Sequence, residues 1–152
     1  MKDLKLRSAK LFDKEKTYEW ANDPLVRKFS FNNDPVSFEN HLKWFMERLN
    51  SNHCAYYILE IEENAVGSIR FDIEKNTAKI NYLIDPEFTG KGLGTRILKE
   101  GIDRLRSEKP SVRIIYGFVI KGNLASIKIF EKLGFKMVLE NGSSLKFEKE
   151  IK

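Results

Sequence analysis

Residues 85–98 read DPEFTGKGLGTRIL, and the five residues in the middle, GKGLG (90–94), carry glycine at every second position. A glycine in ordered structure costs about 0.5–1 kcal/mol relative to alanine, because its backbone loses more freedom on folding. The pattern that follows is that of an amphipathic helix from about residue 92 to about residue 107. The first amides of a helix have no internal partner and, together with the helix dipole, bind anions. We therefore expect residues 90–95 to hold a phosphate or pyrophosphate group.

Two common phosphate-binding patterns do not occur in this stretch. It lacks the P-loop sequence GxxxxGK[ST], and its glycines at Gly90, Gly92 and Gly94 do not have the GxGxxG spacing. Lys91 and Arg96 place positive charge beside the glycines, as an anion site requires. A flexible connection between a strand and a helix remains the alternative interpretation of these residues.

Length and composition indicate one ordinary globular domain. The chain has 152 residues, of which 41% are hydrophobic and 32% charged, and no repeat or linker divides it, so we expect a single domain over residues 1–152. Cys54 is the single cysteine, which excludes a disulfide within the chain, and with only His41 and His53 besides we expect no metal site. No apolar run approaches ~18 residues and the first residues lack a signal-peptide core, so we expect a cytoplasmic protein without a membrane segment.

The net charge of +5 is unevenly distributed along the chain. Residues 1–76 carry 12 basic and 13 acidic side chains, whereas residues 77–152 carry 15 and 9. The whole positive excess therefore lies in the half that contains the glycine stretch. This suits a small polyanionic ligand, although nucleic acid or a solvated basic surface would also account for it.

The periodicity of apolar residues predicts an alternation of strands and helices. Ser37 is a typical helix N-cap and Pro24 a typical first helical residue, while 30–35 reads as a turn. The predicted order is a strand, helices, three strands in a meander, then helix, strand, helix and a closing hairpin, which indicates a mixed sheet with helices on both faces. The predicted strands cover residues 4–9, 54–61, 65–73, 78–85, 112–120, 135–140 and 144–150, and the predicted helices 13–22, a short turn from 24, 37–50, 92–107 and 123–133.

This order, with two short motifs on it, resembles the GNAT superfamily of acyl-CoA-dependent N-acetyltransferases. The first motif, Gln/Arg-x-x-Gly-x-Gly/Ala, corresponds to residues 89–94, with Thr89 in place of the usual Gln or Arg. The second corresponds to Asn123 and Ser126, followed by Phe130 and Leu-Gly-Phe at 133–135. The resemblance covers nearly the whole chain. It implies an α/β (α+β) fold with a mixed, mostly antiparallel central sheet of about seven strands and helices on both faces.

The resemblance also implies acetyl-CoA as co-substrate, without a metal. The glycine stretch would bind its pyrophosphate, and the Thr89 hydroxyl can still donate to a phosphate oxygen. The backbone around Leu83 and Ile84 would pair with the pantetheine arm where two central strands splay, and the second motif would lie along the same arm. The implied cofactor-binding residues are Leu83, Ile84, Thr89, Gly90, Lys91, Gly92, Leu93, Gly94, Thr95, Asn123, Ser126 and Phe130.

Two catalytic assignments that are common in the family do not carry over to this sequence. Phe130 stands where many members have a tyrosine that protonates the leaving thiolate, and residues 79–82 offer no carboxylate where many have a glutamate. A thiol has a reference pKa near ~8.5, so its thiolate leaves tolerably well at neutral pH. We therefore expect departure without an acid, or with help from water or Ser126. A CoA-binding module without transfer activity is the alternative.

The remaining catalytic candidates are Tyr82, Ser126 and His41. Tyr82 alternates with apolar residues and could instead belong to the core, and His41 could be an acceptor-side base or a partly exposed helix histidine. A backbone N–H near the end of the strand over 78–85 is the expected donor to the developing oxyanion. Cys54 lacks a visible activating partner and is expected to be a packed thiol. Arg70 and Asp72 share a strand face and could contact the acceptor or only each other.

The N-terminal half, with the stretch SFNNDPVSFENHLKWF (30–45), resembles a GNAT subgroup with two branches. One branch acetylates amino groups of nucleotide-linked sugars and includes domains fused to enzymes of pseudaminic-acid synthesis, and the other acetylates N-termini of ribosomal proteins. The stretch favours the amino-sugar branch, so we expect acetyl-CoA and a small amine as partners. A nucleic-acid binder is the alternative of a different class, but the basic residues are interspersed with acids and no nucleic-acid motif occurs. A homodimer stays open.

Overall fold

The structure is a computed structural model that describes residues 3–31 and 34–152. The expected order of elements is confirmed, with boundaries within a few residues of the predicted ones. The turn expected over 30–35 contains Asn32 and Asn33, which lie outside the described residues. The elements are β1 (Leu4–Ser8), the 3-10 turn η1 (Leu11–Asp13), α1 (Lys14–Asn22), α2 (Pro24–Arg27), α3 (Phe38–Leu49), β2 (Cys54–Ile61), β3 (Asn64–Glu74), β4 (Thr77–Ile84), the 3-10 turn η2 (Pro86–Phe88), α4 (Leu93–Glu108), β5 (Ile114–Ile120), α5 (Leu124–Lys132), β6 (Lys136–Asn141) and β7 (Ser144–Glu150).

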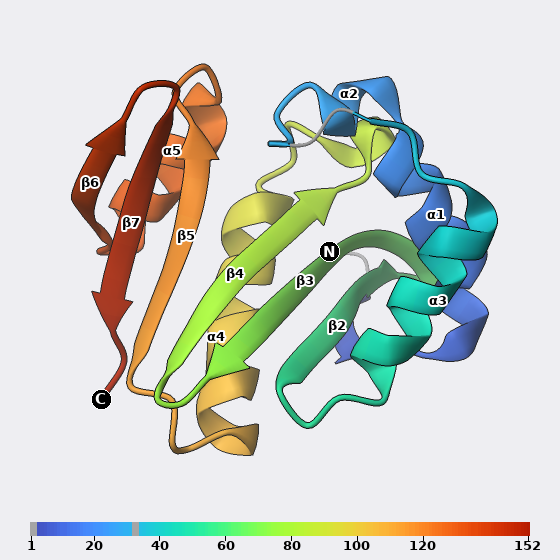
Figure 1. Cartoon of the computed structure of the whole chain (residues 1–152), viewed down its shortest axis with the longest axis horizontal. Coiled ribbons are helices and arrows are strands. Elements are labelled where there is room, and N and C mark those ends of the chain that lie inside the picture. The colour runs from blue at the N-terminus through green and yellow to red at the C-terminus, as the bar shows by residue number, and fades with distance from the viewer. Residues whose placement is uncertain (1–2, 32–33) are drawn as a thin grey trace.

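The strands form one seven-stranded sheet in the order β1-β2-β3-β4-β5-β7-β6 (Figure 1). Every neighbouring pair is antiparallel except β4 and β5, which are parallel. A parallel pair needs a crossover, and α4 provides it. The prediction of a mixed, mostly antiparallel sheet of about seven strands is thus confirmed.

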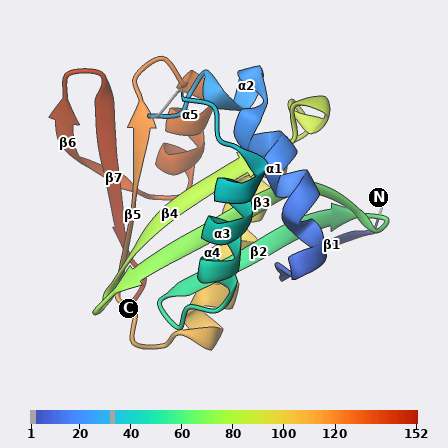
Figure 2. The same ribbon diagram turned by 45° about the vertical axis from the view of Figure 1, so that its right-hand side comes forward.

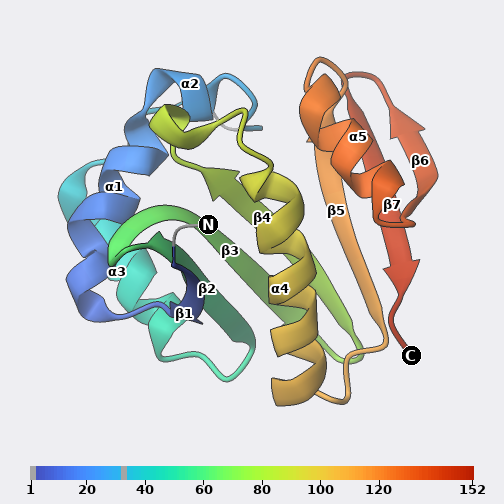
Figure 3. The same cartoon turned by 180° about the vertical axis from the view of Figure 1, so that it is seen from behind.

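Helices cover both faces of this sheet. Figure 2 shows α1 and α3 in front of β2, β3 and β4, and Figure 3 shows α4 and α5 on the opposite face. Because side chains alternate across a strand, each face has its own core. The larger core lies under α4 and α5 and includes Ile69, Phe71 and Ile97, and the smaller lies under α1 and α3 and includes Trp20 and Phe45.

Local sequence accounts for the ends of the N-terminal helices. The Ser37 side chain caps α3 by accepting a hydrogen bond from the Asn40 amide at 3.2 Å. Asp23 caps α2 by accepting from the Leu25 amide at 2.8 Å, and Pro24 occupies the first helical position. Both caps fill orphan amides of a first helical turn. The sequence predicts the Ser37 cap and the place of Pro24, and the structure adds the Asp23 cap.

The two central strands separate after a short contact. Residues Thr77–Lys79 of β4 pair with Ile114–Tyr116 of β5, and no further pairing between these strands occurs in the described part of the chain. Beyond this point β4 and β5 diverge, as Figure 1 shows. The strands therefore open toward the end of β4, where the glycine stretch begins.

Candidate active site

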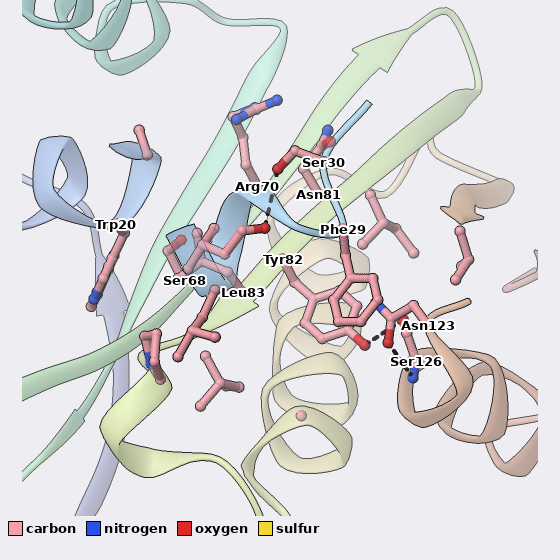
Figure 4. A pocket seen from close by; sticks show the side chains of 18 of the residues that line it. Trp20, Phe29, Ser30, Ser68, Arg70, Asn81, Tyr82, Leu83, Asn123 and Ser126 are labelled. Atoms are coloured by element: carbon pink, nitrogen blue, oxygen red, sulfur yellow. Dashed lines mark hydrogen bonds between the residues drawn. The ribbon is translucent and has the colours of Figure 1, made fainter. Parts of the chain in front are cut away.

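A cleft of about 1320 Å³ occupies the opening between β4 and β5. Its lining comes from β4, the glycine stretch and α5, and continues to α1, α2, α3 and the middle of β3. Figure 4 shows Tyr82, Asn123 and Ser126 at one end of this cleft and Trp20, Ser68 and Arg70 toward the other. One continuous space thus connects the predicted CoA residues to the side chains of the N-terminal half.

The backbone of β4 is satisfied on one side and open on the other. The Asp85 amide donates to the Val66 carbonyl at 2.8 Å, and Leu83 lies opposite Ser68 in the same antiparallel register. Backbone groups alternate in direction along a strand, so Leu83 faces β3, whereas Tyr82 and Ile84 face the gap. The backbone groups that face the gap are therefore those of Tyr82 and Ile84, whereas the sequence-based expectation named Leu83 and Ile84, and the Leu83 side chain lines the cleft.

The glycines before α4 serve two different purposes. Gly90 and Gly92 have φ of 78° and 76°, in the left-handed region that favours glycine, and an added Cβ at either would meet no atom within 4 Å. A Cβ on Gly94 would lie 2.8 Å from Cδ1 of Ile129, so Gly94 lets α4 approach α5. Conformation, rather than lack of space, thus requires glycine at the first two positions.

The amides at the start of α4 are placed as an anion site requires, but the neighbouring side chains are arranged differently from expectation. Leu93, Gly94 and Thr95 form the first helical turn, whose amides have no intrahelical partner. Thr89 donates its hydroxyl to the Pro86 carbonyl at 3.1 Å, and Arg96 pairs with Glu100. Lys91 is exposed and does not line the cleft. The backbone, more than side-chain charge, therefore makes this end of the cleft suitable for an anion.

Asn123 and Ser126 form the cap of α5. The Asn123 Oδ1 accepts a hydrogen bond from the Ser126 amide at 3.2 Å, so the Asn-x-x-Ser pattern has a local structural role. The Ser126 hydroxyl lies 2.7 Å from the Tyr82 hydroxyl across the opening (Figure 4). Burial raises the pKa of Tyr82, and the hydrogen bond with Ser126 offsets part of this rise. Tyr82 thus lines the cleft as a protonated phenol joined to a second hydroxyl.

Phe130 belongs to the core under α5, although one edge of it reaches the cleft. Its ring is 2% exposed and stacks on Phe147 with centroids 5.4 Å apart. A Cβ added to Gly117 of β5 would lie 3.0 Å from Cζ of Phe130, so the tip of the ring points at the sheet. A hydroxyl at this tip would meet the β5 backbone rather than a ligand.

His41 is buried, which corrects the interpretation of a partly exposed helix histidine. It is 4% exposed, stacks on Phe45, and its Nε2 lies 2.9 Å from Oγ1 of Thr17. The Thr17 hydroxyl also contacts the Asp13 carbonyl at 2.8 Å, so Thr17 links the His41 ring to the start of α1. Burial lowers the pKa of His41, which keeps the ring neutral at pH 7. His41 still lines the cleft.

Cys54 is a packed thiol, as expected. It is buried in β2, and burial raises its pKa to about 11, with a smaller contribution from the neighbouring Asp72 carboxylate. The thiolate is the nucleophilic form of cysteine, and it is scarce at neutral pH when the pKa is this high. An acyl-enzyme on Cys54 therefore has no support.

Arg70 and Asp72 contact each other, and Arg70 also faces the cleft. The Nε of Arg70 lies 3.2 Å from Oδ1 of Asp72, and its guanidinium carbon lies 4.9 Å from the centre of the Trp44 ring. The ring of Tyr56 lies on the other strand beside it, 6.0 Å from the same carbon. An arginine and two aromatic rings therefore form one wall of the cleft, and the Asp72 carboxylate pairs with the arginine from outside the lining.

Trp20 connects α1 to Asp85, which follows β4 and precedes the glycine stretch. Its Nε1 donates to Oδ2 of Asp85 at 2.9 Å, while Oδ1 of Asp85 accepts from the Glu87 amide at 2.9 Å. The sequence does not indicate that Trp20 belongs to this site, because no local pattern links residue 20 to residue 85. Trp44 lies four residues before Arg48, a spacing that places the two side chains on one helix face.

The charged residues that line the cleft are all basic, namely Lys28, Arg70 and Lys79. No aspartate or glutamate is among the described residues of the lining. Within residues 3–31 and 34–152, no group of three or more His, Cys, Asp and Glu side chains could hold a metal ion. Across the same residues, no helix is both long and apolar enough to span a membrane.

Comparison with known proteins identifies the family through a family model. Residues 3–136 match the family model described as an acetyltransferase (GNAT) domain. An uncharacterised protein of Methanocaldococcus jannaschii is 31% identical over 133 residues, which are 82% of this chain but only 26% of that protein. The L-amino acid N-acyltransferase MnaT of Escherichia coli is 30% identical over 113 residues, which are 69% of this chain and 63% of that protein.

A solved structure of similar fold contains a ligand related to the expected one. The spermidine N-acetyltransferase from Vibrio cholerae, in complex with CoA and spermine, superposes with a TM-score of 0.85 over 97% of this chain and 95% of that chain. The identity is 19%, so the likeness concerns the fold.

Proposed function

The chain belongs to the acetyltransferase (GNAT) domain family, and on this premise we propose that it transfers an acetyl group from acetyl-CoA to a primary amine of a small molecule. The observation that carries the proposal is the gap beside β4, where the backbone groups of Tyr82 and Ile84 have no strand partner. The pantetheine arm of acetyl-CoA carries amides that would complete this ladder. The glycine stretch at the end of the same gap supports binding of the pyrophosphate.

The main part of the chain in the reaction is to hold the two substrates together and to place polar groups beside the reacting atoms. Acetyl-CoA supplies the acetyl group as a reactive thioester when it is bound. The N–H groups of Tyr82 and Ile84 point into the gap, so one of them can stabilise the negative charge that develops on the carbonyl oxygen. Holding the amine against the thioester in one cleft supplies much of the remaining acceleration.

Ser126 is the proposed proton donor to the leaving thiolate. Its hydroxyl lies at the start of α5 beside the gap, and the Tyr82 hydroxyl 2.7 Å away can replace the proton that Ser126 gives up. The raised pKa of Tyr82 keeps this phenol protonated at neutral pH. His41 is neutral and lines the acceptor side, which makes its imidazole a candidate to take the proton of the amine.

The proposed acceptor is the amino group of a nucleotide-linked amino sugar. The resemblance of residues 30–45 to the amino-sugar branch motivates it, and the basic lining of the cleft supports a phosphate-bearing acceptor. A cleft without acidic side chains gives a polyamine no counter-charge, so a spermidine-like substrate has no support here. An N-terminal peptide of a ribosomal protein remains the alternative within the family.

An α-amino acid is a second candidate acceptor. The relative MnaT of Escherichia coli is named for L-amino acids, and it shares 30% identity with this chain. The basic lining of the cleft suits a carboxylate as well as a phosphate.

A CoA-release assay tests the proposal directly. Acetyl-CoA is offered with amino-sugar nucleotides, L-amino acids, ribosomal-protein N-terminal peptides and polyamines, and we expect turnover on an amino-sugar nucleotide. Turnover on a ribosomal peptide with none on any amino-sugar nucleotide would reverse the assignment of the acceptor. Binding of acetyl-CoA without turnover on any amine would instead indicate a CoA-binding module.

A further inference from the structure

Arg70 is held in a fixed position on the acceptor side of the cleft. It lies in the middle of β3, its side chain is 19% exposed, and its guanidinium rests on the ring of Trp44. Asp72 contacts Nε and Nη2 of Arg70 at 3.2–3.3 Å. An arginine that is stacked and paired loses little further freedom when it binds a second partner. The side chain is therefore preorganised.

Positive charge exceeds negative charge around Arg70. The carboxylate of Asp72 is shared between Arg70 and Arg48, whose Nη1 lies 3.6 Å from it, and Lys79 lies opposite Asp72 on β4. The buried Nε of Arg48 has no hydrogen-bond partner. Two arginines thus share one carboxylate, and a lysine stands opposite it on the neighbouring strand. A single arginine–carboxylate pair would be neutral, whereas this cluster retains positive charge beside a cleft whose described lining contains no acidic side chain.

Arg70 is close to the place where the amine must react. Its partner across the sheet is Asn81, the residue before Tyr82, whose free backbone faces the gap. Neighbouring strands lie about 4.8 Å apart. A group that contacts Arg70 can therefore belong to the same small molecule as an amine in the gap.

We propose that Arg70 binds an anionic group of the acceptor, a carboxylate or a phosphate, and thereby selects acceptors that carry one. This rests on the proposed acetyltransferase function for the identity of the ligand as acceptor. The planar guanidinium matches both anions through paired hydrogen bonds, and the aromatic rings of Trp44 and Tyr56 exclude water that would weaken them. Asp72 orients Arg70 without neutralising the cluster.

The test uses probe pairs that share an amine and differ in the anion. L-methionine is compared with L-methioninamide for the carboxylate, and glucosamine 1-phosphate with glucosamine for the phosphate. Binding to the CoA-saturated protein is measured by calorimetry, and turnover by CoA release. Loss of the carboxylate also lowers the basicity of the methioninamide amine, which favours its neutral form and works against the expected preference.

We expect the protein to bind the anionic member of at least one pair about tenfold or more tightly, and the preferred pair identifies carboxylate or phosphate. Arg70→Gln should weaken binding of that anionic member by roughly 10–100-fold and leave the neutral member nearly unchanged, as a lost charged hydrogen bond predicts. Arg70→Lys keeps the charge but not the planar guanidinium. Its affinity for the anionic member should therefore lie between those of the unchanged protein and Arg70→Gln. Arg106→Gln, at an exposed position on α4, is the matched control.

Equal affinities within both pairs, or an Arg70→Gln effect of the same size on both members, would overturn the inference. Absence of binding by either anionic probe would overturn it as well. Anion-dependent binding without CoA release would support Arg70 as an anion receptor while contradicting the proposed acetyltransferase. Acetyl-CoA affinity, measured separately for each variant, confirms that the variant is folded.

Discussion

Phe130 determines where a proton donor can stand in this cleft. Its ring points at Gly117 and is packed between Phe147 and Phe135, so position 130 cannot present a hydroxyl to a thiolate. The hydroxyl pair of Tyr82 and Ser126 lies on the open side instead. The sequence showed that the usual tyrosine is absent, but only the structure places another tyrosine beside the motif serine.

Phe130→Tyr should therefore destabilise the protein without adding an acid. The new hydroxyl would be forced against β5 in an apolar site, which costs about 1–3 kcal/mol through overpacking and an unpaired polar group. Urea unfolding measures the loss. Phe118→Tyr is the matched control, since Phe118 is 37% exposed and its new hydroxyl can reach water. A stable Phe130→Tyr variant with a higher kcat would contradict this assignment.

Ser126→Ala should lower kcat by about 10²-fold, at the low end of general acid catalysis, because the CoA thiolate already leaves tolerably well. The Michaelis constant for acetyl-CoA should change little, since the Asn123 cap of α5 does not use the serine hydroxyl. Tyr82→Phe should have a smaller effect, because Ser126 remains to donate. Steady-state kinetics with a saturating amine measures both variants. A larger loss in Tyr82→Phe than in Ser126→Ala would show that the tyrosine donates directly.

At the level of elements, Asp85 joins α1 to the segment that leads into the glycine stretch. One carboxylate oxygen accepts from Trp20 on α1, and the other accepts from the Glu87 amide in η2. Lys16 lies 3.4 Å from the same carboxylate. Burial raises the pKa of Asp85, but the hydrogen bonds and the Lys16 charge outweigh it, so the net shift is downward.

This arrangement predicts an acid-sensitive link. A lowered folded pKa means that the Asp85 contribution to stability is fully present above its unfolded value of about 3.9 and is lost as the pH falls through the folded pKa. Trp20→Phe removes the indole donor and should cost about 1.5–3 kcal/mol at neutral pH, as a hydrogen bond to a charged group does. Urea unfolding at neutral and acidic pH measures the pH dependence.

A double-mutant cycle of Trp20→Phe with Asp85→Asn separates this link from simple loss of packing. We expect a coupling energy of about 0.5–3 kcal/mol between the two sites, since they are in direct contact. Additive effects would show that the indole ring, rather than its N–H, is what α1 contributes.

At the scale of the whole molecule, the elements followed from the sequence because each has its own local cause. Ser37, Asp23 and Pro24 mark helix starts, and the alternation over residues 54–85 marks the meander. Residues 89–94 and the cap at Asn123 likewise adopt a conformation that their own local sequence determines. These features depend on neighbours in the chain, which a sequence displays directly.

The composition of the cleft could not be derived in the same way. Trp20 meets Asp85, and Tyr82 meets Ser126, over separations of 65 and 44 residues. The direction of the Leu83 and Ile84 backbone depends on the register with β3, and a shift of one residue would exchange their roles. The burial of His41 depends on the packing of α1 against α3. Such facts arise from tertiary contacts, so the sequence supplied the candidates but not their partners.

The same register gives a prediction for the two halves of the molecule. The β4 and β5 strands share only the pairing of Thr77–Lys79 with Ile114–Tyr116, so little of the sheet joins the half that ends in β4 to the half that begins with β5. A ligand arm in the gap would bond to the side of β4 that faces β5 and would leave the side paired with β3 unchanged. Ligand that binds only the folded state at 100 times its Kd adds about 2.7 kcal/mol of stability.

Amide hydrogen exchange followed by NMR should therefore respond to CoA in an alternating pattern along β4. Without CoA, the amides of Tyr82 and Ile84 should exchange quickly, because they face the gap, whereas Asn81 and Leu83 should be protected by β3. CoA should slow exchange at Tyr82 and Ile84 by much more than at Leu83, and adenosine 3′-phosphate 5′-diphosphate, which is CoA without the pantetheine arm, is the matched control. Equal protection of all these amides would indicate general stabilisation and would contradict the pairing of the arm with β4.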